Sequence, residues 1–283
     1  MSNLPEKREG VIKNQFKLIS SDKKEYILTE YITTDTISIY IGGKTKYCIQ
    51  GQLYKKDSPF SRILDVTEGI LLHLYYDKEC DLTDTFERNT DTHKLLQILI
   101  SYIKHNYPYI TKLKFNDAST RTCDNGSTVD LSIMSFLIYG KTWYERHFNA
   151  YLDEKDREPF IRAVTDYNTK KQKIDWGMMK SYILTDFPLP ENQMEKLYNN
   201  SPLWQDFFYG INKQIGISGF CMFISPWIHG FINPNFKFNV KYATYIFPID
   251  NSAFKPYAKY NSVKYGGYTK RKTIKFRTKR NIK

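Results

Sequence analysis

Acidic residues are absent from the last 33 residues of the chain, because Asp250 carries the final acidic side chain before Lys283. The same segment holds 11 of the 42 lysines and arginines, and with them nearly all of the formal net charge of +12. Residues 1–250 are therefore almost neutral. This distribution favours a folded body with a basic arm for a polyanion.

Cysteine is scarce, and no CxxC pair occurs among the four cysteines, which are Cys48, Cys80, Cys123 and Cys221. This spacing argues against a zinc site and against a disulfide framework. The five histidines show no HxxxH or HExxH spacing, so we expect no metal site. The sequence therefore predicts free thiols in a reducing, intracellular setting.

Secretory and membrane signals are also missing. Met1–Gly10 is polar and charged, without the apolar run of a secretory signal. Gln214–Phe236 contains no charged residue, but glycines and prolines interrupt its apolar residues. We therefore expect a buried helical hairpin there instead of a membrane span.

The two GKT triplets lack the first glycine of a phosphate-binding loop. Gly43 and Gly140 begin the triplets, and the loop requires a further glycine five positions earlier, where Ser38 and Ser135 stand. The first triplet also follows a strand pattern and precedes another, and the second follows a helix pattern. The sequence thus argues against nucleotide hydrolysis.

The residues that are present predict a globular α+β (α/β) fold with a mixed, mostly antiparallel sheet. Hydrophobic residues make up 41% of the chain and aromatic residues 16%. Thr36–Ile41 and Lys46–Tyr54 flank Gly42-Gly43, which is the pattern of a β-hairpin. Gly69–Tyr76 is apolar almost throughout, which is typical of a central strand covered on both faces.

Crossover helices are expected after these strands. A helix capped at Thr90 or Asp91 repeats apolar residues to Ile103, and the strand Ile110–Phe115 follows it. This order allows a right-handed parallel crossover. After a polar loop over residues 117–126, a second helix is expected from Ser127 or Thr128 to Tyr139, with Gly140 as its stop.

The spacing of apolar residues along the chain changes after residue 153. Residues 153–185 and 191–232 predict helices separated by Phe187–Pro190, and 236–247 alternates as a possible returning strand. We therefore expect an α/β domain over 1–150, a mainly helical appendage over 151–250 and a basic, disordered tail over 251–283.

The segment Tyr139–Phe148 (YGKTWYERHF) places aromatic and charged residues directly after the second helix. Aromatic clusters of this kind usually belong to a core. With the strands and helices before it, the segment resembles the second half of the GNAT-type acyl-CoA N-acyltransferase fold, over about residues 36–150. In that family a tyrosine of this segment can protonate the thiolate of coenzyme A, so the resemblance makes Tyr144 the candidate catalytic residue.

The same resemblance places the pyrophosphate of coenzyme A at the start of the first crossover helix. The candidate cofactor-binding residues are Arg88, Asn89, Thr90 and Thr92. The family's loop contains glycines that let backbone N–H groups approach the phosphates. Here glycine is absent and Asp91 adds a negative charge, so we expect a degenerate loop and no cofactor, with acetyl-CoA as the alternative.

The chain also resembles uncharacterised proteins of nucleocytoplasmic large DNA viruses, which often end in Gly-Gly-Tyr-Thr and Lys/Arg runs like Tyr265–Arg280. This resemblance implies a viral protein in the host cytoplasm or nucleus, or in the virion. We expect a non-enzymatic protein that uses residues 251–283 to associate with nucleic acid or a virion assembly, without a membrane. The alternatives are an active N-acyltransferase and a minor virion structural protein.

Phosphate contacts are expected from the basic residues of the tail, which are Lys264, Lys270, Arg271, Lys272, Lys275, Arg277, Lys279 and Arg280. Tyrosines between them would add base stacking that tolerates many sequences. A tail that only aids solubility or nuclear entry is the alternative role.

Overall fold

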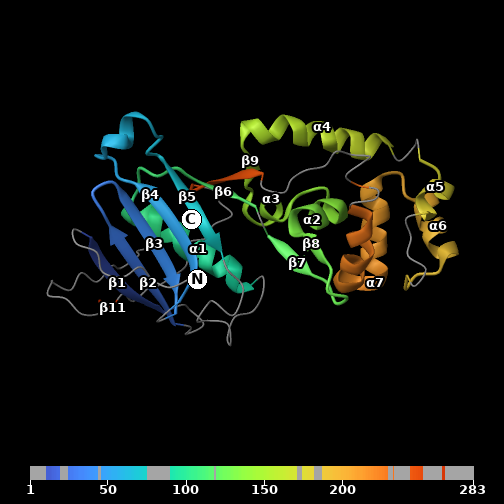
Figure 1. Cartoon of the computed structure of the whole chain (residues 1–283), viewed down its shortest axis with the longest axis horizontal. Helices are drawn as coiled ribbons and strands as arrows, with labels where there is room; N and C mark the ends of the chain where they lie inside the picture. Colours follow the sequence, from blue (N-terminus) through green and yellow to red (C-terminus); the bar gives the residue numbers. More distant parts are fainter. Residues whose placement is uncertain are drawn as a thin grey trace, which may run out of the picture. The chain divides into compact units, whose positions relative to one another are not determined.

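The computed structural model describes residues 11–19, 25–43, 46–74, 90–117, 119–170, 174–181, 187–228, 232, 243–250 and 263–264. The chain divides into two compact units, shown in Figure 1. The first comprises residues 1–115 and 247–283, and the second is the insertion 116–246. This division differs from the expected ranges 1–150, 151–250 and 251–283, because the second helix and Tyr144 belong to the insertion.

The first unit is built on a mostly antiparallel sheet. Its strands β1 to β5 pair antiparallel in chain order, over the ranges Ile12–Ile19, Glu25–Ile32, Thr36–Gly42, Tyr47–Tyr54 and Glu68–Leu74. The predicted hairpin at Gly42-Gly43 is confirmed, since β3 and β4 pair antiparallel there and the Gly43 N–H donates to Lys46 O at 3.0 Å. A short 3-10 helix, η1 (Pro59–Arg62), lies between β4 and β5.

The predicted parallel crossover is also confirmed. Helix α1 (Thr90–Asn106) follows β5 and leads into β6 (Lys112–Asn116), which pairs with β5 in parallel. The apolar spacing of α1 buries Leu95, Leu99 and Ile103 completely. A Cβ added at Gly51 of β4 would lie 3.3 Å from Leu99, so this glycine lets α1 approach one face of the sheet.

The opposite face of the sheet is mixed in character, since Tyr31, Tyr40 and Tyr47 form a buried cluster on it. Lys13, Gln50 and Gln52 are exposed or half-buried there, and Leu72 of β5 remains 39% exposed. The expectation that residues 69–76 form a strand covered on both faces is therefore wrong at Leu72. An antiparallel sheet can leave part of one face in water, and among the described residues α1 packs on the other face.

Two residues of the basic tail form a strand. Val263–Lys264 (β11) pairs antiparallel with β1, with Lys264 opposite Phe16 and Val263 opposite Lys17. The rest of the predicted disordered tail lies outside the described residues. The basic segment is therefore attached to the edge of the first unit's sheet at this point.

The second unit is mainly helical, with two short strand pairs. The hairpin β7–β8 (Thr120–Thr122 and Thr128–Asp130) precedes the helices α2 (Leu131–Tyr139) and α3 (Trp143–Phe148), and β9 (Tyr151–Leu152) pairs with β10 (Thr244–Pro248). The expected stop of α2 at Gly140 is confirmed by its φ of 68° and by its N–H, which donates to Phe136 O at 2.7 Å. The expected start is wrong, because residues 128–130 pair as a strand and Asp130 is the N-cap.

Four further helices confirm the helical pattern after residue 153. They are α4 (Glu154–Lys170), α5 (Trp176–Lys180), α6 (Glu191–Asn200) and α7 (Trp204–Trp227). Helix α7 is interrupted at Gly216, whose φ of 71° and ψ of 175° are not helical, and Figure 1 draws it as two helical segments in orange. The core of this unit gathers aromatic side chains, including Trp204, Phe208 and Trp227, all fully buried.

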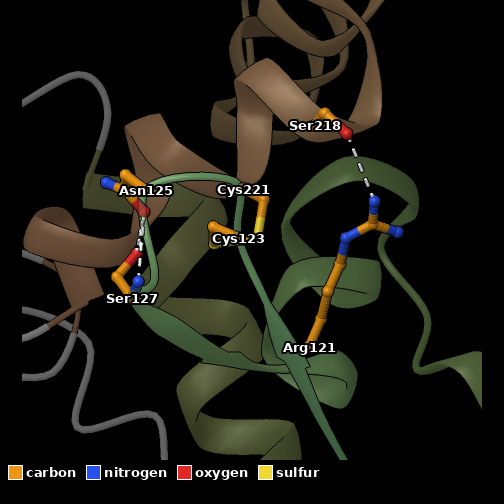
Figure 2. The surroundings of a disulfide bond; sticks show 6 residues. All are labelled: Arg121, Cys123, Asn125, Ser127, Ser218 and Cys221. Atoms are coloured by element: carbon orange, nitrogen blue, oxygen red, sulfur yellow. Dashed lines mark hydrogen bonds between the residues drawn. A yellow bond between two sulfur atoms is a disulfide. The ribbon is translucent and has the colours of Figure 1, made fainter.

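Cys123 and Cys221 form a disulfide, shown in Figure 2. Cys48 is disulfide-bonded too, and the described residues include no free cysteine. The prediction of free thiols is therefore wrong. The 98 residues between Cys123 and Cys221 hide their pairing from local sequence patterns, because only the packing of the β7–β8 hairpin against α7 brings them together.

Candidate functional site

Tyr144 is positioned by the turn that joins α2 to α3. After the stop at Gly140, Thr142 caps α3: its N–H donates to Glu145 Oε2 at 2.7 Å, and its Oγ1 accepts from the Glu145 N–H at 3.4 Å. This reciprocal capping box fixes the first turn of α3. The aromatic segment Trp143–Phe148 thus forms a short helix that begins directly after Thr142.

The Tyr144 side chain is only 7% exposed. Its ring lies 5.0 Å from the Trp143 ring and 5.6 Å from the Tyr245 ring of β10. Burial raises the pKa of Tyr144, and the charge of Asp117 raises it further, whereas a hydrogen bond with Ser119 lowers it. The hydroxyl is therefore kept protonated in the interior of the second unit.

Asp117 follows directly after β6, and it is 2% exposed. Its backbone N–H donates to Ala243 O at 3.2 Å, and its Oδ1 accepts hydrogen bonds from the backbone N–H (2.9 Å) and hydroxyl of Ser119. Burial raises the pKa of this carboxyl, and hydrogen bonds from Ser119 and Ser132 oppose the rise. The arrangement is a buried carboxyl surrounded by hydroxyl groups.

Tyr245 completes this group, which we call the Asp117 cluster: Asp117, Ser119, Ser132, Tyr144 and Tyr245. Burial raises the pKa of Tyr245, and the hydroxyl of Thr142 lowers it. A carboxyl with a raised pKa beside a tyrosine hydroxyl can hold or transfer a proton. Its members are all at least half-buried, so the cluster also fits a purely structural role in the interior of the second unit.

The predicted cofactor-binding residues belong to the first unit or lie outside the described residues. Arg88 and Asn89 lie outside the described residues, and Thr90 begins α1 of the first unit. Thr92 is half-buried in the first turn of the same helix.

Sequence reasoning missed Asp117 and Ser119. The only local signal was their place in the polar loop after a strand, where Asp and Ser commonly bond to the backbone two residues away. The Ser119 N–H bond to Asp117 Oδ1 is such a contact. Burial of Asp117 depends on α2 and on the segment that enters β10, which the loop sequence does not reveal.

The charge of the chain is divided unequally between the units. Residues 116–246 contain 14 acidic and 14 basic residues, so the whole net charge of +12 belongs to the first unit and its tail. Of the predicted nucleic-acid contacts, Lys264 lies in β11, and the remaining seven residues lie outside the described part of the chain. The first unit is therefore the candidate polyanion interface.

The described part of the chain contains no group of three or more His, Cys, Asp or Glu side chains placed to hold a metal ion. None of its helices has both the length and the apolar character needed to cross a membrane.

Comparison of the chain with protein-family models, with curated proteins and with solved structures finds no match.

Proposed function

We propose that the protein is a non-enzymatic nucleic-acid-associating protein of acyltransferase-like fold, and that its basic C-terminal segment makes the contact. The pairing of β11 with β1 carries this proposal, because it attaches the acid-free segment to a folded sheet. The arm then presents its charge from a fixed point. Eight of its 11 basic residues follow Tyr265, beyond this attachment.

Electrostatics supports the same assignment. The second unit is neutral, so repulsion or attraction by a polyanion acts mainly on the first unit and its tail. The tail has tyrosines between its basic residues and no helix pattern that could read a groove. Binding should therefore tolerate many sequences and depend strongly on salt.

The test compares the full chain with a chain that ends at Tyr265, which keeps β11. Fluorescence anisotropy with single-stranded RNA and duplex DNA would be measured between 50 and 200 mM salt. If 6 to 10 phosphates are engaged, the affinity of the full chain should fall by about 10³ to 10⁵ over this range. Equal affinity of the two chains would contradict the proposal.

A matched pair of triple variants separates a tail site from general charge. Lys270, Lys272 and Lys275→Gln removes three charges from the tail, and the control replaces Lys155, Lys196 and Lys213, all exposed in the second unit, by Gln. Both variants lose the same charge. Only the tail variant should weaken binding and lower the salt slope, by about one for each lost phosphate contact. Binding of neither nucleic acid would contradict the proposal and favour the alternative, a tail that binds an acidic virion surface.

An active N-acyltransferase is the second candidate. The parallel crossover β5–α1–β6 and the place of Tyr144 beside a buried carboxyl support it. Thermal unfolding with acetyl-CoA distinguishes the two: ligand at 100 times its dissociation constant should stabilise a binding protein by about 2.7 kcal/mol. The first proposal expects no shift.

A further inference from the structure

The turn that carries Cys123 is organised by its own hydrogen bonds. The Cys123 N–H donates to Ser127 O at 2.7 Å, and the Gly126 N–H donates to Cys123 O at 2.9 Å. Asn125 Oδ1 accepts from the Ser127 N–H at 3.1 Å and from its hydroxyl at 2.7 Å, as Figure 2 shows. The position of the Cys123 sulfur within the hairpin is therefore set locally.

The partner sulfur is fixed by the core. Cys221 is fully buried in the second segment of α7, and it belongs with Phe220 to the hydrophobic core of the second unit. One turn earlier, Ser218 Oγ accepts a hydrogen bond of 3.3 Å from Arg121 Nη2. Figure 2 shows that both contacts join the β7–β8 hairpin to the same helix.

Other contacts hold this hairpin weakly. It has three residue pairs, Thr120 to Asp130, Arg121 to Val129 and Thr122 to Thr128, and of these side chains only Val129 is buried. A hairpin of two strands is at best marginally stable by itself. The covalent bond is therefore a main attachment of the hairpin to α7.

We propose that oxidation of Cys123 and Cys221 completes the fold of the second unit, and that the protein works in an oxidised state. Their exposures are 4% and 0%, so a reductant reaches neither sulfur unless the unit opens. The bond is thus a permanent part of the structure and not a rapid switch. The expectation of an intracellular setting, which rested on free thiols, is therefore no longer supported.

The reaction that supplies this state is thiol–disulfide exchange with a disulfide-bearing oxidant. One cysteine thiolate attacks the oxidant's disulfide, forms a mixed disulfide and releases one thiol of the oxidant. The second thiolate attacks the protein sulfur of that mixed disulfide and releases the other thiol. The two cysteines lose two protons and two electrons, and the oxidant's disulfide is reduced to two thiols.

Peptide mapping of the full chain tests the proposal. Protein refolded with oxidised and reduced glutathione would be denatured in excess N-ethylmaleimide without reductant and digested. We expect a peptide pair linked through Cys123 and Cys221 and no maleimide on either residue. Labelling of both cysteines in protein that is otherwise folded would overturn the proposal.

Thermal unfolding adds a second readout. Without reductant, the wild type should unfold about 10 °C above the Cys123→Ala/Cys221→Ala variant. When both proteins are reduced in denaturant and refolded with a phosphine reductant present, the difference should nearly disappear, and Cys48 is present in both proteins. Equal unfolding temperatures without reductant would contradict a role in completing the fold.

Nucleic-acid binding by the tail should be unchanged in the variant, so failure of this inference leaves the proposed function standing.

Discussion

The hydroxyl of Tyr102, on α1, donates a hydrogen bond of 3.0 Å to Oε1 of Glu30, on β2. Glu30 is 3% exposed, and it also accepts hydrogen bonds from the Tyr107 hydroxyl and from Asn14 Nδ2 at 2.9 Å. Burial and the charge of Glu30 raise the pKa values of both tyrosines. The Glu30 carboxylate therefore accepts hydrogen bonds from three neutral donors on the face of the sheet that α1 covers.

Tyr102→Phe should lower the free energy of unfolding by about 1.5 to 3 kcal/mol, because it removes a hydrogen bond to a charged group. Tyr109→Phe is the matched control, since its hydroxyl donates at 3.0 Å to the neutral backbone oxygen of Tyr54 and should cost about 0.5 to 1.5 kcal/mol. Chemical denaturation of the full chain measures both. Equal losses would mean that the hydrogen bond to Glu30 stabilises the fold no more than one to a neutral oxygen.

Sequence patterns predicted the parts of the first unit whose contacts are close along the chain. The apolar repeat from Leu95 to Ile103 gave α1, and alternation over residues 110–115 gave most of β6. The parallel pairing of β5 with β6 followed from the length of the helical connection between them. These features depend on local periodicity, which a single sequence displays.

The division into units and the Asp117 cluster could not be predicted in the same way. The insertion begins at Asn116 and ends at Ile246, and the chain returns in β10, where Phe247 stacks on Phe115 at 4.5 Å. The alternation over residues 236–247 indicated a returning strand, but no local pattern showed its partner, because this contact joins residues more than 130 positions apart. The disulfide was missed for the same reason.

Asp117→Asn should stabilise the folded protein at neutral pH. The pKa of Asp117 is raised in the folded state, mainly by burial, so the folded protein binds this proton more tightly than the unfolded chain does. The resulting stabilisation is complete below the unfolded value of about 3.9 and is lost as pH rises through the folded pKa. The free energies of unfolding of the wild type and the variant should therefore differ most above the folded pKa of Asp117 and converge below the unfolded value of about 3.9.

Urea denaturation from pH 3 to pH 8 checks this expectation. The amide keeps an acceptor for the Ser119 N–H and avoids the buried charge. Asp130→Asn is the control, since that residue lies near the same cluster but is only partly buried. A variant at Asp117 that is much less stable than the wild type at pH 7 would show that the carboxylate is needed in its charged form.

Tyr144→Phe separates the structural role of this residue from a catalytic one. Loss of its hydrogen bond with Ser119 should cost about 0.5 to 1.5 kcal/mol of unfolding free energy. Nucleic-acid binding should not change, because the tail belongs to the first unit. If wild-type protein transfers acetyl groups from acetyl-CoA and the variant does not, Tyr144 is catalytic and the non-enzymatic proposal is wrong.

Gly216→Ala should destabilise the second unit through the backbone alone. The residue interrupts α7 with a φ of 71° and a ψ of 175°, a backbone conformation that residues with a side chain rarely adopt. An added Cβ would meet nothing within 4 Å, so steric crowding by neighbours does not contribute. The strain should cost about 1 to 3 kcal/mol, measured by chemical denaturation.

Gln214→Ala is the control for this substitution, because Gln214 is exposed in the same helix and has no unusual φ. It should change the free energy of unfolding by less than about 0.5 kcal/mol. A loss at Gly216 as small as that at Gln214 would mean that α7 can continue through residue 216 without its break. Cys221 would then be carried by a straight helix, and the disulfide with Cys123 would have to form from a different arrangement of the same two elements.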